Sequence, residues 1–194
     1  MMPRHVMITV GVLLVAVFLT GFYVLQLKKT AEQQAQRTDS RPVAPPAAGP
    51  EEVVTLTIAY DDDAVFRSVK VSMPVPPEKT ERAREVLRAL IAEYTQKPSP
   101  HPLAEGADVR EVFLVNDLAI VDLNPALADA HRSGAFVETL TLTSMAATLA
   151  QNVPGVQRVR FLVDGKERET LAGHADLMAT YDVKQVQELV KGLQ

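Results

Sequence analysis

The alternation of apolar and polar positions predicts a series of strands after residue 52. Residues 53–60 (VVTLTIAY) and 64–73 (AVFRSVKVSM) alternate as half-buried strands do, and an acidic turn separates them, so we expect an antiparallel pair. Residues 108–124 hold two more such runs, joined at Asn116 and Asp117, which both tolerate the positive φ of a two-residue hairpin turn. Residues 156–165 (VQRVRFLVDG) predict a strand that ends in an Asp-Gly turn.

Apolar residues spaced three and four apart predict two amphipathic helices. The first is expected to be capped by Thr80 and to turn Arg82, Glu85 and Arg88 outward. Its buried face would consist of Ala83, Val86, Leu87, Leu90, Ile91 and Tyr94. The second, at residues 182–194, would bury Val186, Leu189, Val190 and Leu193.

Residues 136–151 carry conflicting signals. The β-branched alternation that begins at Val137 is typical of a strand, whereas Glu138, Leu142 and Leu149 lie on one helical face. The length of the stretch and the Pro-Gly stop that follows it favour a helix.

An apolar stretch of 22 residues without a charge, residues 6–27, precedes the predicted domain. As a helix it would extend about 33 Å, enough to cross a hydrocarbon layer of about 30 Å, so we expect a transmembrane anchor at residues 1–27. A cleaved signal peptide is the alternative, but its apolar region is usually shorter and ends at a small-x-small site. Residues 28–52 are rich in Pro and Ala and predict a linker. The domain would then occupy residues 53–181, and the C-terminal helix residues 182–194.

Charge and composition restrict the function. Residues 53–194 contain 15 Lys and Arg against 20 Asp and Glu, a net charge of −5, which argues against binding to nucleic acid or anionic lipid. The chain has no cysteine, so disulfides, thiolate chemistry and a lipid-modified cysteine are excluded. It has no tryptophan, and Phe113, Phe136 and Phe161 follow a core-like periodicity, so carbohydrate stacking is not indicated.

Candidate metal ligands and nucleophiles are scattered along the chain. Residues 61–63 (DDD) lack the glycine and the distal glutamate of a calcium loop, so a solvated turn is favoured. His101, His131 and His174 each stand alone, without a second ligand at zinc spacing. No Gly-x-Ser-x-Gly turn, carboxylate pair or glycine-rich phosphate loop stands out. We therefore expect no enzymatic activity, no metal and no cofactor.

The stretch 162–177 (LVDGKERETLAGHADL) is either a catalytic loop or a structural element. In the structural interpretation Gly173 provides conformational freedom, while His174 and Asp176 satisfy backbone groups. Replacing His174 with Ala would then cost about 1–3 kcal/mol of stability. The alternative is a site for cell-wall material, enzymatic or ligand-binding, formed by His174 and Asp176.

Several motifs, taken in order, resemble the GerMN domain family of sporulation and spore germination proteins. They are LAIVDLN at 118–124, Gly134 with Glu138 at a helix start, ATLAQNVPGVQRVRFLVDG at 147–165 and LAGHADL at 171–177. The resemblance implies an α/β domain with two main helices packed on one side of a small mixed or antiparallel sheet, similar to ring-building domains. It makes candidate structural or interaction residues of Glu138, Asp164, Gly165, Gly173, His174 and Asp176.

The resemblance also implies a non-catalytic interaction or scaffold module of a bacterial envelope, anchored by one helix with its domain outside the cytoplasmic membrane. Its partners would be other envelope proteins or a second copy of the chain. Lys28 and Lys29 follow the apolar stretch, so the positive-inside rule alone mildly favours the opposite orientation, a small bias that the resemblance outweighs. A role in germination itself does not follow, because such domains also occur in bacteria that form no spores.

Overall fold

The computed structural model describes residues 49–194, which begin with a long β-hairpin. Strands β1 (Glu51–Tyr60) and β2 (Val65–Pro74) pair antiparallel in one continuous register. Val54, Leu56 and Ile58 point from one face of β1 into the core, as the alternation requires. The predicted antiparallel pair is confirmed, and β1 begins two residues before the expected start of the domain.

Helix α2 (Lys79–Thr95) follows and buries the apolar face that its spacing predicts. Two details of the prediction are wrong. The cap is Glu78, whose carboxylate accepts a hydrogen bond from the N–H of Glu81 at 2.7 Å, so Thr80 lies inside the helix. Glu85 is buried rather than solvent-facing, because the guanidinium groups of Arg84 and Arg88 donate to its Oε1 at 3.2 and 3.0 Å.

Four strands form a second sheet in the order β3-β4-β5-β6. Strands β3 (Val109–Val115) and β4 (Leu118–Leu123) make the predicted hairpin, in which Asn116 has a φ of 56°. Strand β5 (Arg158–Val163) runs parallel to β4, and the short β6 (Tyr181–Asp182) is antiparallel to β5. The mixed α/β class is confirmed, but the expected single small sheet is wrong, since the hairpin β1–β2 is a sheet of its own.

The disputed stretch is helix α4 (Ala135–Asn152), which the short helix α3 (Pro125–Asp129) precedes. Helix α4 is buried on most of its circumference, including the polar residues Thr141, Ser144 and Thr148. A helix buried on several sides shows no single apolar stripe, which explains the conflicting pattern in its sequence.

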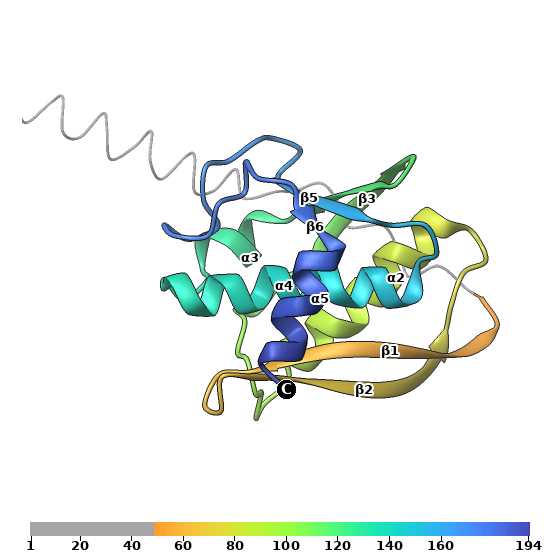
Figure 1. The fold of residues 1–194 in the computed structure, drawn as a ribbon, viewed down its shortest axis with the longest axis horizontal. Coiled ribbons are helices and arrows are strands. Elements are labelled where there is room, and N and C mark those ends of the chain that lie inside the picture. Colours follow the sequence, from red (N-terminus) through yellow and green to blue (C-terminus); the bar gives the residue numbers. More distant parts are fainter. Residues whose placement is uncertain (1–48) are drawn as a thin grey trace, which may run out of the picture. The chain divides into compact units, whose positions relative to one another are not determined.

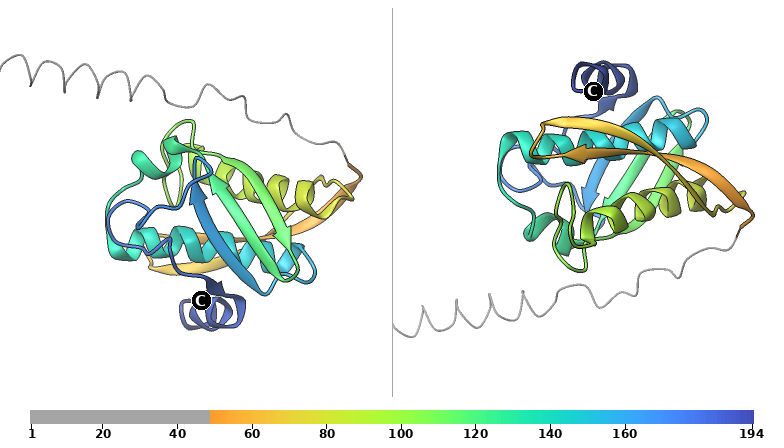
Figure 2. Two further views of the ribbon diagram at one scale, coloured as in Figure 1. Left: turned by 90° about the horizontal axis from the view of Figure 1, so that it is seen from above. Right: turned by 90° about the horizontal axis from the view of Figure 1, so that it is seen from below.

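Helices α2 and α4 lie between the four-stranded sheet and the β1–β2 hairpin (Figure 1). The two views of Figure 2 agree, with the sheet nearest the viewer from above and the hairpin nearest from below. The helices therefore cover one face of the four-stranded sheet and leave its other face open.

Side chains from the two helices close the free edge of β1. An unpaired strand edge exposes backbone N–H and C=O groups, and buried groups of this kind need partners. The N–H groups of Thr55, Thr57 and Ala59 donate to side-chain oxygens of Asn152, Thr148 and Tyr94, each at 2.9 Å. This bonding fixes α2 and α4 against the hairpin.

Helix α5 (Val183–Gly192) ends the fold and packs on α4. Asp182 caps it by accepting from the N–H of Lys184 at 2.8 Å, and Val186 and Val190 are buried as predicted, whereas Leu189 is 40% exposed. No helix within residues 49–194 has the length and apolar character to cross a bilayer. The predicted anchor at residues 1–27 and nearly all of the linker lie outside the described residues.

Candidate functional site

The carboxylate of Glu138 organises the motif that the sequence singled out. Glu138 lies in the first turn of α4, and its side chain has no exposed surface. Its Oε2 accepts hydrogen bonds from the backbone N–H groups of Ala172, His174 and Ala175 at 3.0, 3.0 and 2.9 Å. Its Oε1 accepts from the N–H of Gly134 at 3.0 Å. One side chain thus binds both the start of its own helix and the loop 172–175.

These bonds determine the protonation state of Glu138. Burial by itself raises the pKa of the carboxyl group, but the backbone N–H groups of Gly134, Ala175, Ala172 and His174 outweigh it and lower the pKa to about 2. Glu138 is therefore ionised throughout the physiological pH range. A carboxylate with so low a pKa is a poor general base at neutral pH, because an efficient general base has a pKa close to the pH at which it works.

The loop 171–177 has the geometry of a tight structural turn. Leu171 and Leu177 are buried at its two ends, and Gly173 has a φ of 119°, a conformation that favours glycine. Asp176 accepts from the N–H groups of Met178 and Ala179 at 2.7 and 3.2 Å, which is the turn-capping role predicted for it.

His174 has a different partner from the predicted one. Its Nδ1 lies 3.0 Å from Oε1 of Glu138, not at a backbone carbonyl, and 3.4 Å from the hydroxyl of Ser133. The side chain is 48% exposed. The four backbone N–H groups would still bond to Glu138 if the imidazole ring were removed. The ring therefore adds one contact to Glu138 and is not needed for the other four.

Asp164 and Gly165 form the predicted turn after β5. Both have positive φ, 55° and 69°, as a two-residue hairpin turn requires. The N–H of Gly165 donates to Oδ1 of Asp122 at 2.7 Å, and the carboxylate of Asp164 pairs with Arg110 of β3. These two candidates therefore join the ends of β3, β4 and β5.

The remaining metal candidates do not form a metal centre. Within residues 49–194 no three His, Cys or carboxylate side chains are arranged to hold an ion. Asp62 and Asp63 are exposed as expected, but Asp61 is not a solvated turn residue, because it contacts His101 and Arg132. His101 and His131, which stand alone in the sequence, both contact the hydroxyl of Thr141.

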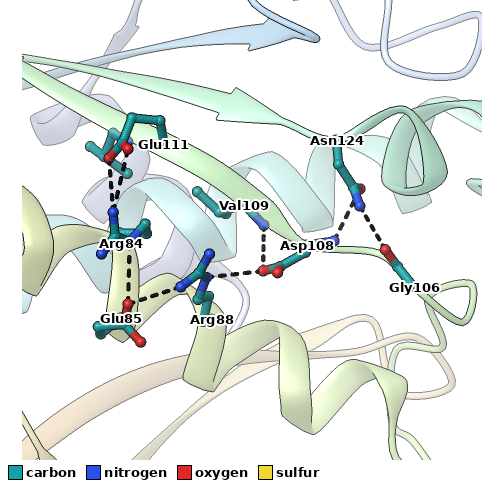
Figure 3. Close-up of polar contacts among 9 residues, drawn as sticks. Arg84, Glu85, Arg88, Gly106, Asp108, Val109, Glu111 and Asn124 are labelled. Atoms are coloured by element: carbon teal, nitrogen blue, oxygen red, sulfur yellow. Dashed lines mark hydrogen bonds and ion pairs between the residues drawn. The ribbon is translucent and has the colours of Figure 1, made fainter. Parts of the chain in front are cut away.

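A chain of ion pairs that no sequence pattern predicted joins α2 to β3 (Figure 3). Arg84 lies 3.3 Å from both carboxylate oxygens of Glu111 and also contacts Glu85, which bonds to Arg88 in turn. Nε of Arg88 lies 3.4 Å from Asp108, whose pKa is raised by burial. Removing one member of such a chain leaves a buried charge without its partner, so the chain fixes the position of the helix on the strand.

The open face of the four-stranded sheet carries exposed apolar side chains. Phe113 and Val115 of β3 are 50% and 52% exposed, so the core position expected for Phe113 is wrong. Phe136 is also exposed, at 46%, whereas Phe161 is buried as expected. Residues that are paired directly across neighbouring strands lie on the same face of the sheet. The register therefore places Ile120 and Arg160 in line with Phe113, and it places Leu118 and Arg158 in line with Val115. We call these six residues the outer sheet face.

The fold and site define a small mixed α/β domain in which the buried carboxylate of Glu138 holds the loop 172–175. The chain belongs to the Germane family, described as sporulation and spore germination, which matches residues 55–169. The resemblance to GerMN domains is thereby confirmed, and the domain is GerM-like.

Two solved structures of GerMN domains are similar to the chain. The first GerMN domain of the sporulation protein GerM from Bacillus subtilis is 16% identical, over 66% of this chain and 94% of that one, with a TM-score of 0.48. The tandem GerMN domains of the same protein are 16% identical, over 70% of this chain and 48% of that one, with a TM-score of 0.51. The latter likeness indicates a common fold. No curated protein sequence matches the chain.

Proposed function

We propose that this GerM-like chain is a non-catalytic interaction module of a bacterial cell envelope. The observation that carries the proposal is the bonding of Glu138, whose two oxygens accept four backbone N–H groups. The carboxylate that contacts the ring of His174 is therefore already bonded to the backbone and holds the loop in place.

The outer sheet face supports a role in protein contact. It is apolar on the edge strand β3, at Phe113 and Val115, and charged on β5, where Arg158 and Arg160 pair with Asp117 and Glu167. Exposed apolar side chains bordered by charged ones are common in interfaces between proteins. The partner would be another envelope protein or a second copy of this chain.

The proposed location is the outer side of the cytoplasmic membrane, with residues 1–27 as a single-pass anchor. A reporter that is active only outside the cytoplasm, fused after Gln194, tests this topology. Activity is expected with that reporter, and activity only with a cytoplasm-dependent reporter would refute the proposed location.

Photo-crosslinking in intact cells tests the interaction. A photoreactive residue replaces Phe113 in the full chain, and the matched control replaces Lys184, which is exposed on α5. We expect a discrete crosslinked product from position 113 and none of the same size from position 184. Equal, diffuse labelling at both positions would contradict the proposal.

A cell-wall enzyme or ligand-binding protein is the second candidate, and the contact of His174 with Glu138 favours it. A carboxylate on one ring nitrogen orients a histidine, and the ring is half exposed. Asp176, the other residue of this alternative, accepts from the N–H groups of Met178 and Ala179 and caps the following turn. Cleavage of peptidoglycan by the full chain, lost in a folded His174→Ala variant, would establish this candidate in place of the first.

A further inference from the structure

Four polar side chains from four separate segments meet inside the domain. Asp61 follows β1, His101 lies between α2 and β3, His131 lies between α3 and α4, and Thr141 is in α4. His101 and Thr141 have no exposed surface, and His131 is 8% exposed. The ring nitrogens Nε2 of His101 and His131 lie 2.6 and 2.7 Å from the same hydroxyl oxygen, Oγ1 of Thr141.

The partners of the two Nδ1 atoms determine where the hydrogens are. Nδ1 of His131 lies 2.7 Å from the backbone carbonyl oxygen of Arg132, which can only accept, so this nitrogen carries a hydrogen. Nδ1 of His101 lies 2.5 Å from Oδ1 of Asp61. Asp61 also forms an ion pair with Arg132, and a carboxylate in an ion pair only accepts hydrogen bonds.

A neutral imidazole has one N–H, so both Nε2 atoms would then be acceptors. The hydroxyl of Thr141 has a single hydrogen and can donate to one of them only. The other Nε2 must donate to the hydroxyl oxygen, and that ring is then an imidazolium. If the hydroxyl instead donated to the carbonyl of Val137, at 3.2 Å, both rings would have to be charged.

We propose that Asp61, His101, His131 and Thr141 form a proton-binding cluster that joins three loops of the domain and loosens them when its one proton is lost. The three loops are the β1–β2 turn, the α2–β3 loop and the α3–α4 loop, the last of which leads directly to Gly134 and Glu138.

The charged and titratable groups around the cluster allow one proton and oppose a second. Asp61 faces His101, and Glu138 of α4 attracts a charge on His131, whereas Arg132 repels a charge on either ring. From α2, the ring of Tyr94 contacts His101 edge-on with centroids 4.7 Å apart, and burial raises its pKa, so it stays neutral. The ring centroids of His101 and His131 are 6.2 Å apart, so positive charges on both rings would repel each other.

Burial also makes the single proton easy to release. It lowers the pKa of His101, against the opposing effect of Asp61, and it lowers the pKa of His131. The proton is therefore expected to leave as the pH rises from mildly acidic values, after which Thr141 can bond to only one ring.

Nitrogen NMR of the full chain with ¹⁵N-labelled histidine tests the cluster, because ring shifts distinguish an imidazolium from each neutral tautomer. At the acidic end of a pH titration of the folded chain we expect one of His101 and His131 to be an imidazolium and the other to be neutral with its hydrogen on Nδ1. At about pH 8 both should be neutral, and the hydrogen-exchange protection factor of the Asp61 N–H, which donates to Pro100, should fall about tenfold.

Two variants provide matched controls. Thr141→Ser keeps the hydroxyl and should titrate as the wild-type chain does, whereas Thr141→Val removes the shared acceptor and should abolish the imidazolium. The wild-type and Ser titrations decide the question even if the Val variant does not fold. Two neutral rings or two imidazolium rings at the lower pH would overturn the proposal, and so would an unchanged protection factor across the titration.

Discussion

Replacing Glu138 with Gln changes one oxygen of a fully engaged carboxylate into an amide NH₂ and leaves the shape of the side chain almost unchanged. If the NH₂ takes the place of Oε1, it meets the N–H of Gly134, which is then left without an acceptor. If it takes the place of Oε2, three backbone donors of the loop 172–175 lose theirs. In either orientation the amide NH₂ of Gln faces a backbone N–H group, and neither can accept a hydrogen bond from the other.

The expected loss of stability follows from this count. One unsatisfied buried donor costs about 1–3 kcal/mol. The bonds that remain lose their charge assistance and become roughly half as strong. We expect Glu138→Gln to lower the free energy of unfolding by about 3 kcal/mol, and Glu138→Ala, which removes every acceptor, by about 4 kcal/mol or more.

Equilibrium denaturation of the full chain measures both variants, with Glu188→Gln as the control because Glu188 is an exposed glutamate on another helix. The control should differ from wild type by less than about 0.5 kcal/mol. A loss below about 1 kcal/mol for Glu138→Gln would refute the assignment of Glu138 as the group that holds the loop.

The stability difference between wild type and Glu138→Gln should depend on pH. The pKa of Glu138 is lowered from 4.5 to about 2 in the folded chain, so its stabilisation is complete above pH 4.5 and is lost as the pH falls toward 2. The difference in stability between wild type and Glu138→Gln should therefore narrow over that interval. A constant difference down to pH 2 would mean that the carboxylate is not the titrating group.

The other predictions concern single contacts, each measured by denaturation of the full chain. Tyr94→Phe removes the acceptor of the buried Ala59 N–H and should cost about 1–3 kcal/mol; a neutral result would contradict the closure of the β1 edge. Gly165→Val introduces a β-branched side chain at a φ of 69° and should cost about 1–3 kcal/mol, and no loss would exclude this turn geometry. His174→Ala should cost less than about 1 kcal/mol, below the range that the sequence suggested, because the ring is half exposed and Glu138 keeps its backbone donors.

The sequence predicts local structure well where one face of an element is buried. Strand β2 alternates between half-buried and exposed positions from Ser68 onward, and the spacing of apolar residues in α2 identifies its core face. The prediction failed where polar residues are buried by partners distant in the sequence. Glu85 is a related case: its partners Arg84 and Arg88 are close in the sequence, but Arg84 also contacts Glu111 of β3, 27 residues away.

The site was only partly predictable for the same reason. Glu138 was identified by family resemblance alone, because its loop donors lie 34 to 37 residues away in the chain and no spacing rule connects them. His101 lies 40 residues from both Asp61 and Thr141, so the histidines looked isolated. The turn at Asp164 and Gly165 was predictable, because its φ values depend on the two residues themselves.

Comparison of Phe113→Asp with His174→Ala, each in the full chain, tests whether the outer sheet face is the surface that binds the partner. The measurement is the amount of partner that is crosslinked to the chain in intact cells, with the unfolding free energy of each variant determined in parallel. We expect Phe113→Asp to leave stability within about 0.5 kcal/mol of wild type but to abolish the crosslinked complex, and His174→Ala to retain the complex. A stable His174→Ala chain that loses the complex, beside a Phe113→Asp chain that keeps it, would show that the partner binds at the His174 loop and not at the outer sheet face.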